Sequence, residues 1–315
     1  MIPYTEIVSE LKKRGITKTA VQMPEGLKRF APELAGILRE NGISCLISGD
    51  PCWGACDLAK DAAEDAGFLV HIGHTPVTEE ENVLYIPYRK DISKAALEQA
   101  AAVLKPYGCV SVTTTIQHSH QIEELAKTLQ ELGVNAVIGP GSSRTPEPGQ
   151  VLGCTYASAR NAKADANLFI GTGVFHAIGV ALATKKPTYA LDPFGNGELQ
   201  EVSADPLLRK RFVQIEKAKK AQSFGILLSS KSGQKRKELA ERLASLHPNA
   251  SVILIREISE MELRNLGFDA YVNTACPRLA MDDQSRFPFP LLSPPEFEIV
   301  LGLRSWDDYE IDEII

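Results

Sequence analysis

The chain repeats one pattern three times: a short run rich in β-branched residues, a turn, and then a helix with one apolar face. Strands that alternate with helices are typical of βαβ units with parallel pairing. The three stretches with this pattern are TAVQMPEGLKRFAPELAGILREN, CVSVTTTIQHSHQIEELAKTLQELG and FGILLSSKSGQKRKELAERLASL. This repetition constrains the fold more than any other feature, because each copy predicts a sheet of its own.

Each copy continues with further strand-like runs. These are SCLISGD, FLVHIGH and VLYIPYR in the first, NAVIGPG, NLFIGTG and PTYALDP in the second, and SVILIREI and AYVNTAC in the third. We therefore predict an α/β fold of three Rossmann-like domains with parallel sheets, at residues 1–105, 106–205 and 206–315. Ligands of open α/β sheets bind beyond the carboxyl ends of the strands, so three such domains would face a shared central site.

The composition, 44% hydrophobic and 23% charged, is that of an ordinary soluble globular protein. No apolar run approaches the roughly 18 residues that span a bilayer, and the N-terminus lacks the apolar segment of a secretory signal. A net charge of -6 argues against direct nucleic-acid binding. We expect a cytoplasmic protein with no membrane contact, whose six cysteines are thiols rather than disulfides.

The cysteines fall into two groups by their neighbours. Cys45 and Cys109 lie in apolar runs, and we interpret both as buried core thiols. Cys56, Cys154 and Cys276 lie in GACDLA, LGCTYA and NTACPRLA, where small neighbours leave the thiol accessible. Each of these three belongs to a different predicted domain, so one thiolate from each domain could converge on one point.

Three thiolates are informative because a 4Fe-4S cluster usually takes four cysteines, one for each iron. Three would leave one iron open to a substrate, whereas a structural zinc site would normally have a fourth protein ligand. Cys52, in GDPCWGACDLA, is the remaining cysteine. It could be a fourth cluster ligand, a residue next to the cluster or a buried thiol, and we favour the last two. The CxxxCxxC loop of standard radical S-adenosylmethionine enzymes is incomplete here, because Ala59 stands at the third cysteine position.

Longer segments resemble a known family. VQMPEGL, GDPCWGACDLA, HIGHTPV, LGCTYA, GTGVFHAIG, LDPF, NTACPRLA and SPPEFEIVLG are similar to those of the archaeal radical enzymes of the first step of diphthamide synthesis. The resemblance extends from about Val21 to Gly302. Many relatives have Tyr where Trp53 stands, and eukaryotic ones often have Cys where Asp57 stands. Neither difference touches the three cysteines.

The resemblance implies that Cys56, Cys154 and Cys276 hold a 4Fe-4S cluster whose open iron engages S-adenosylmethionine. Reductive cleavage between sulfur and the γ-carbon would then transfer the 3-amino-3-carboxypropyl group to C2 of a histidine imidazole in translation elongation factor 2. Methylthioadenosine would leave. The resemblance also implies an electron donor and a homodimer.

Residues near predicted strand ends are candidates for binding the cosubstrate, with turn formation or capping as the alternative for each. They are Gln22, Glu25, Gly171, Gly173, His176 and Asp192. His118 and His120 form an H-x-H pair that would share one face of a strand, although no third ligand stands at a convincing spacing.

Two other functions stay open. A lyase resembling quinolinate synthase also combines three α/β domains with a three-cysteine cluster, but uses the open iron as a Lewis acid on a small dicarboxylate. An iron-sulfur electron carrier would shuttle electrons without consuming a cosubstrate.

Overall fold

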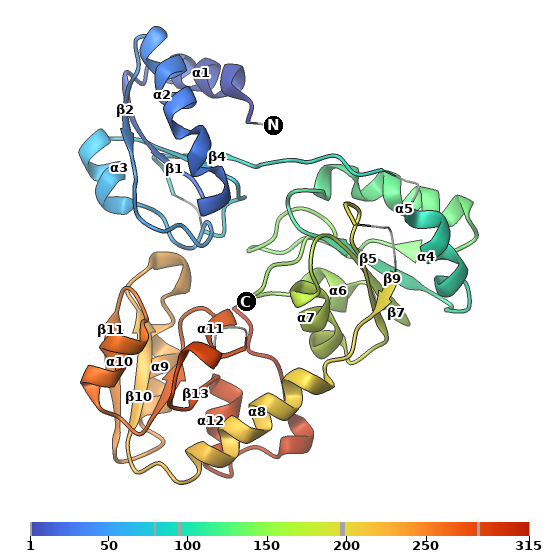
Figure 1. The fold of residues 1–315 in the computed structure, drawn as a ribbon, viewed down its shortest axis with the longest axis vertical. Coiled ribbons are helices and arrows are strands. Elements are labelled where there is room, and N and C mark those ends of the chain that lie inside the picture. Colours follow the sequence, from blue (N-terminus) through green and yellow to red (C-terminus); the bar gives the residue numbers. More distant parts are fainter. Residues whose placement is uncertain (1, 79, 94–95, 196–198, 282–283, 315) are drawn as a thin grey trace.

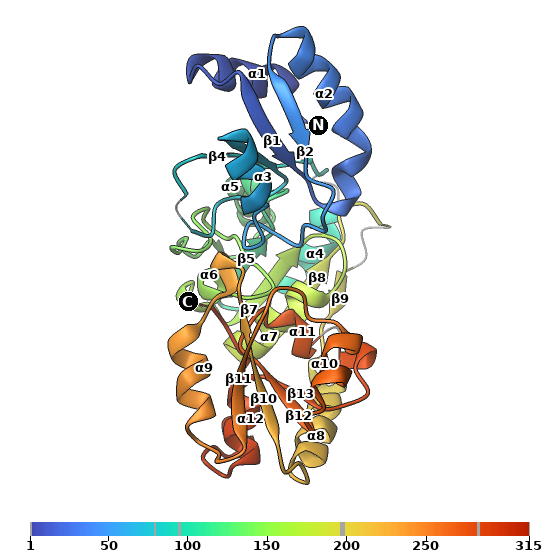
Figure 2. The same ribbon diagram turned by 90° about the vertical axis from the view of Figure 1, so that its left-hand side faces the viewer.

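The computed structural model describes residues 2–78, 80–93, 96–195, 199–281 and 284–314. Figure 1 shows three α/β units, coloured blue, green and orange along the chain. The first and third units lie at opposite ends of the molecule in both views, and Figure 1 shows the second unit to one side of them (Figure 2). Each unit contains its own sheet, and the predicted α/β fold with three parallel sheets is confirmed.

The first unit has a four-stranded parallel sheet in the order β2-β1-β3-β4. Leu11, Leu34 and Leu38, from two helices, pack with Val21 and Val70 of the sheet to form its main core. The elements are α1 (Tyr4–Lys13), β1 (Lys18–Gln22), the 3₁₀ helix η1 (Glu25–Phe30), α2 (Ala31–Glu40), β2 (Ser44–Ile47), α3 (Lys60–Ala66), β3 (Leu69–Ile72) and β4 (Val83–Ile86).

The second unit has the order β6-β5-β7-β8-β9, in which β9 is antiparallel. Leu97 and Leu104 of α4 share a core with Val110 of this sheet, so α4 packs with the second sheet. The domain boundary after residue 105 stays a prediction. The elements are α4 (Ala96–Leu104), β5 (Val110–Thr114), η2 (Ser119–Gln121), α5 (Ile122–Glu131), β6 (Ala136–Val137), α6 (Ala157–Asn161), β7 (Ala166–Ile170), α7 (Phe175–Thr184), β8 (Thr188–Leu191) and β9 (Leu199–Glu201).

The third unit has the parallel order β11-β10-β12-β13. Phe224, Val272 and Phe297 lie at the centre of its core. The elements are α8 (Asp205–Ala218), β10 (Phe224–Ser229), η3 (Ser232–Gln234), α9 (Lys237–Ala244), β11 (Ala250–Ile255), α10 (Glu260–Leu266), β12 (Ala270–Asn273), α11 (Arg278–Met281), η4 (Gln284–Arg286), β13 (Leu291–Leu292), α12 (Pro294–Val300) and η5 (Trp306–Asp308).

The parallel strands of all three sheets follow one order: second, first, third, fourth. The chain therefore leaves the first and third strands in opposite directions, which opens a crevice at their carboxyl ends. The loops after β1 and β3, β5 and β7, and β10 and β12 occupy these positions. Among the helices in the described ranges, none is both long enough and apolar enough to cross a membrane.

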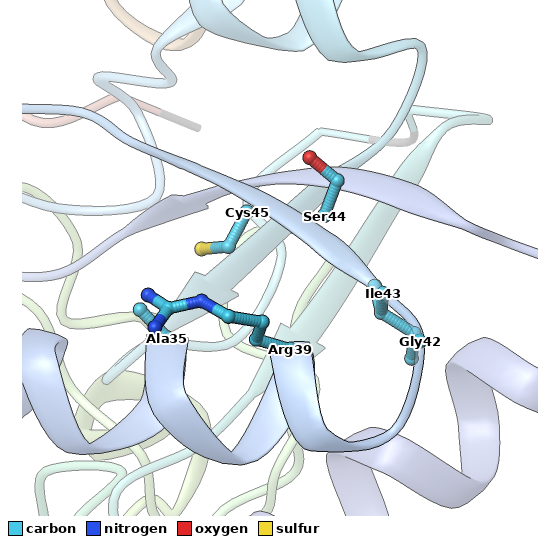
Figure 3. A pocket seen from close by; sticks show the side chains of 6 residues that line it. All are labelled: Ala35, Arg39, Gly42, Ile43, Ser44 and Cys45. Atoms are coloured by element: carbon cyan, nitrogen blue, oxygen red, sulfur yellow. The ribbon is translucent and has the colours of Figure 1, made fainter.

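Cys45 and Cys109, interpreted above as buried core thiols, are both only partly buried, although Cys45 packs against the core of the first unit. Cys45 lies on β2, an edge strand whose Leu46 and Ile47 are 38% and 43% exposed. Figure 3 shows the Cys45 thiol and the Arg39 side chain in a pocket lined by residues of α2 and β2. Burial raises the pKa of Cys45, and Arg39 partly opposes this shift.

A buried ion pair holds α8 against α12 in the third unit. Arg211 and Glu296 are 1% and 0% exposed, and the guanidinium donates to both carboxylate oxygens at 2.8 and 2.6 Å. Arg211 also donates to the carbonyl of Leu291, while Glu296 accepts from the backbone N–H of Ser293 at the start of α12. Because both charges are fully paired, the long connecting helix has a fixed position on the sheet.

We predict that Glu296→Gln lowers the free energy of unfolding of the third unit by about 3–5 kcal/mol, because it leaves the Arg211 cation buried without its counter-charge. Denaturant unfolding followed by the fluorescence of Trp306, which packs on Tyr309, measures this. The control is Glu241→Gln, which breaks the exposed pair with Lys237 and should cost no more than about 1 kcal/mol. Equal losses in the two variants would contradict the prediction.

Candidate functional site

The thiols of Cys56, Cys154 and Cys276 approach one another where the three units meet. Cys56 lies in the loop after β2, Cys154 in the loop before α6, and Cys276 three residues beyond β12. Burial, together with the nearby thiols of Cys56 and Cys154, raises the pKa of Cys276 to about 12. Burial also raises the pKa of Cys56, with Cys154 again contributing. At neutral pH Cys56 and Cys276 are therefore protonated thiols, which would lose their protons on binding a cation.

The third unit touches the first at the Cys56 backbone. A Cβ built on Gly233 would lie 2.4 Å from the Cα of Cys56, so only glycine permits this approach. The next residue, Gln234, is 6% exposed and donates from Nε2 to the Sγ of Cys56 at 3.3 Å. The loop after β10 thus both contacts Cys56 and supplies a hydrogen bond to its sulfur.

Arg144 joins the second unit to this contact. It is 7% exposed, and its Nε donates to the Sγ of Cys154 at 3.3 Å. Its Nη2 donates to the carbonyl oxygen of Gly233 at 2.7 Å. One guanidinium therefore connects a thiol of the second unit to the loop of the third unit that covers Cys56.

A second contact between the first and third units joins the loop after β2 to the loop after β10. Lys231 Nζ lies 3.0 Å from a carboxylate oxygen of Asp57 and 2.6 Å from one of Glu257. Burial raises the pKa of Asp57, and the hydrogen bond from Lys231 opposes that shift. The residue after Cys56 is thereby tied to the strand end of the third unit.

The segment of residues 309–314 returns to the second unit and contacts the loop of Cys154. The backbone N–H of Ile314 donates to the carbonyl of Cys154 at 2.8 Å. The carboxylate of Glu313 accepts from the backbone N–H of Tyr156 at 2.7 Å and pairs with Arg160. We call residues 309–314 the C-terminal strap.

Sequence reasoning did not find Arg144, Gln234, Lys231 or Gly233. Three of them lie in SKSGQ, directly after β10, so their place at a strand end was an available signal. Arg144 lies in the irregular loop GSSRTPEPG and carried no such signal. Its role depends on which loops meet, and spacing along the chain does not reveal that.

Two of the candidate cosubstrate residues lie in the first unit. The Gln22 side chain is buried, donates to the carbonyl of Asp57 at 2.7 Å, and accepts from the backbone N–H of Ala59 at 3.1 Å. It holds the segment that follows Cys56. Glu25 is 61% exposed at its side chain and pairs with Lys28 at 2.6 Å.

The other four candidates lie in the second unit: Gly171 and Gly173 follow β7, His176 lies in the first turn of α7, and Asp192 follows β8. Gly171 is buried and Gly173 exposed, and His176 stacks on the ring of Phe169 at a centroid distance of 5.5 Å. The start of α7 lies beside the Cys154 loop, because a Cβ on Gly153 would meet the ring of Phe175 at 2.7 Å. The carboxylate of Asp192 accepts from the backbone N–H of Phe194, which is a turn contact.

A different trio of ligand-type side chains lies in the first unit. The ligand atoms of Cys52, His71 and His74 all lie within 4.8 Å of one another. Within the described residues, no other three His, Cys or acidic side chains come this close. The central thiols are spaced more widely than that. Burial lowers the pKa of His71 to about 3 and of His74 to about 4, and raises that of Cys52 to about 12.

The H-x-H pair is not on a strand. His118 lies in a turn and His120 in η2. Nδ1 of His118 is 2.7 Å from the carbonyl of Lys90, and Nε2 of His120 is 2.8 Å from the carboxylate of Asp91. Each ring thus has a partner of its own.

We predict that Gly233→Ala opens the contact between the first and third units, because the new Cβ overlaps the Cys56 backbone. Overpacking of this kind costs about 1–3 kcal/mol. The expected result is a lower melting temperature and faster alkylation of Cys56, measured by mass spectrometry of the peptides. Gly26→Ala is the control, since a Cβ there meets no atom within 4 Å; a wild-type alkylation rate in Gly233→Ala would refute the prediction.

Comparison with known proteins gives consistent matches. The family model described as "Putative diphthamide synthesis protein" matches residues 23–311. The 2-(3-amino-3-carboxypropyl)histidine synthase of Pyrococcus horikoshii is 39% identical, over 100% of this chain and 94% of its own length. Subunit 1 of the mouse 2-(3-amino-3-carboxypropyl)histidine synthase is 32% identical, over 99% of this chain and 74% of its own length.

Solved structures agree with the sequence matches. A crystal structure of Dph2 from Pyrococcus horikoshii with a 4Fe-4S cluster matches with a TM-score of 0.94 at 39% identity, covering 100% of this chain and 94% of that one. A second crystal structure of the same protein gives a TM-score of 0.93. The fold, the full-length identity and the family match together identify this chain as a member of the diphthamide synthesis protein family.

Proposed function

We propose that this chain is a transferase that moves the 3-amino-3-carboxypropyl group of S-adenosylmethionine to C2 of a histidine imidazole in translation elongation factor 2. The proposed centre is a 4Fe-4S cluster held by Cys56, Cys154 and Cys276. The observation that carries the proposal is the approach of three thiols, one from each unit, in a chain 39% identical to a 2-(3-amino-3-carboxypropyl)histidine synthase.

The residues present fit a cluster better than a single ion. Thiolates are the usual ligands of 4Fe-4S clusters, and the central thiols are spaced more widely than a trio that closes on one ion. Two of the three sulfurs accept side-chain N–H hydrogen bonds, from Arg144 and Gln234. Hydrogen bonds to sulfur are among the contacts that set a cluster's reduction potential.

When bound and reduced, the cluster would supply the electron that breaks the bond between the sulfonium sulfur and the γ-carbon of S-adenosylmethionine. The chain's own residues would hold the ligating sulfurs, orient the sulfonium and exclude water. An uncharged imidazole is a poor nucleophile at C2, so radical addition suits this target better than polar alkylation. Methylthioadenosine would be the by-product.

We propose Gly171, Gly173 and His176 as cosubstrate contacts, supported by the position of α7 beside the Cys154 loop. Gln22 would act by holding the segment after Cys56. Glu25 and Asp192 stay predictions.

The proposal includes an external electron donor, a homodimer and a reducing, cytoplasmic setting. Edge strands β2 and β11 carry exposed Leu46, Ile47, Val252 and Leu254, which support burial against a second copy. All six cysteines are free thiols, as expected in a reducing compartment.

Replacing Cys56, Cys154 or Cys276 by Ala should remove most of the iron, since each would supply one of only three protein ligands. Iron and sulfide content after anaerobic reconstitution is the measurement. Cys45→Ala, Cys109→Ala and Cys52→Ala are the controls and should retain the iron. Unchanged iron in all three ligand variants would show that the cluster is held elsewhere.

The reduced enzyme with S-adenosylmethionine should release methylthioadenosine, and with elongation factor 2 it should also give a modified histidine. Without the factor, the radical should be quenched to a small amino acid such as 2-aminobutyrate. Chromatography with mass spectrometry identifies the products. The proposal would be overturned if 5'-deoxyadenosine were the main product, or if turnover were equal without reductant. It would also be overturned, in favour of a lyase, if the enzyme did not use S-adenosylmethionine.

A further inference from the structure

Cys52, His71 and His74 come together at the carboxyl edge of the first sheet. Cys52 follows β2, His71 lies in β3, and His74 follows β3 by two residues. Their ligand atoms all lie within 4.8 Å of one another, and Cys52 and His71 are 4% and 0% exposed. The transfer reaction proposed above assigns no role to these three side chains.

The hydrogen bonds around this trio fix which nitrogen carries each proton. Gln22 donates from Nε2 to the carbonyl of Asp57, so its Oε1 is the atom that faces His71. Because Oε1 only accepts, Nδ1 of His71 must carry a hydrogen, and the neutral ring then has a lone pair on Nε2. That Nε2 lies 2.9 Å from Nδ1 of His74, which must therefore donate.

We propose that Cys52, His71 and His74 form a second metal site, which takes one zinc-class divalent cation and is separate from the three central cysteines. The cation takes the place of the hydrogen between the two rings. His74 becomes the tautomer protonated on Nε2, which frees Nδ1 as a ligand, and the thiol of Cys52 gives its proton to solvent. One proton is released, and no electron is transferred.

The geometry is close to what zinc requires. Zn–N bonds of about 2.0–2.1 Å in a tetrahedral site place two nitrogens about 3.3 Å apart, so the rings must separate by a few tenths of an ångström. The thiolate must lie about 3.6 Å from each nitrogen, which is a contraction of at most about 1.2 Å from the 4.8 Å limit on the present spacing. Two imidazoles and one thiolate suit zinc, and leave a fourth position for water or another ligand.

The surrounding contacts resemble the outer shell of a metal site. A ligating histidine usually donates its other N–H to a carbonyl or carboxylate oxygen, which orients the ring. The Oε1 of Gln22 already accepts from Nδ1 of His71 at 2.9 Å. A cation here would tie the loop after β2 to β3, four residues before Cys56. The proposed site would thereby steady the loop that presents a central cysteine.

The test uses the full-length chain with its cluster reconstituted anaerobically, then given zinc chloride and passed through a desalting column. Zinc, iron and sulfide are measured on each sample. The wild type should retain a single equivalent of zinc, and Cys52→Ser and His74→Asn should lose it while keeping their iron. Cys45→Ser, a thiol in the same unit, is the matched control and should keep both metals. A wild type without zinc, or variants that retain it, would overturn the second site.

Alkylation gives a second measurement that needs no variant. Zinc should slow the alkylation of Cys52 in the wild-type chain, and an unchanged rate would count against the site even where the variants fail to fold. Failure of this proposal is distinguishable from failure of the proposed function. If zinc does not bind but iron binding and methylthioadenosine formation are intact, only the second site is refuted. If iron does not bind but zinc is retained, only the proposed transfer reaction is refuted.

Discussion

The backbone contact between Gly233 and Cys56 is the constraint on which the centre of this molecule depends. The third unit approaches the first so closely here that any side chain at position 233 would overlap the Cys56 backbone. The carbonyl of that same glycine accepts a hydrogen bond from Arg144, whose guanidinium also reaches the sulfur of Cys154. At this junction two loops and one side chain connect the three units, and the three thiols approach one another there.

Burial disfavours charge on both kinds of group at this junction, the thiols and the Arg144 guanidinium. It disfavours thiolates, so the pKa values of Cys56 and Cys276 are raised when no cation is bound. It also makes the Arg144 guanidinium a buried charge, which is stable only where acceptors are at hand. The proposed metal centre would stabilise these groups, because its cations would turn the thiols into thiolates that can accept the hydrogen bonds of Arg144 and Gln234. Such binding acts on the folded state alone, and would hold the three units together.

The sequence was informative wherever the pattern was long and local. Alternation of strand and helix predicted three parallel sheets, and small neighbours singled out Cys56, Cys154 and Cys276. Sequence-based prediction failed where an element was short or where a contact joined residues far apart in the chain. Strands β9 and β13 hold only three and two residues, too few for a periodic signal. Cys45 looked like a core residue because an apolar run does not tell an edge strand from a central one. Arg144 is recognisable only once two loops far apart in the chain are seen to meet.

The C-terminal strap has a consequence for how the protein is made. Ile314 bonds the carbonyl of Cys154, and Glu313 bonds the backbone of Tyr156. Ribosomes release a chain from its N-terminus, and domains tend to fold in that order during synthesis. The first two units can form their sheets early, but Cys276 and then the strap emerge only after them. Cys276 is the last of the three thiols to be translated, so the three-thiol centre cannot form before the third unit is being made.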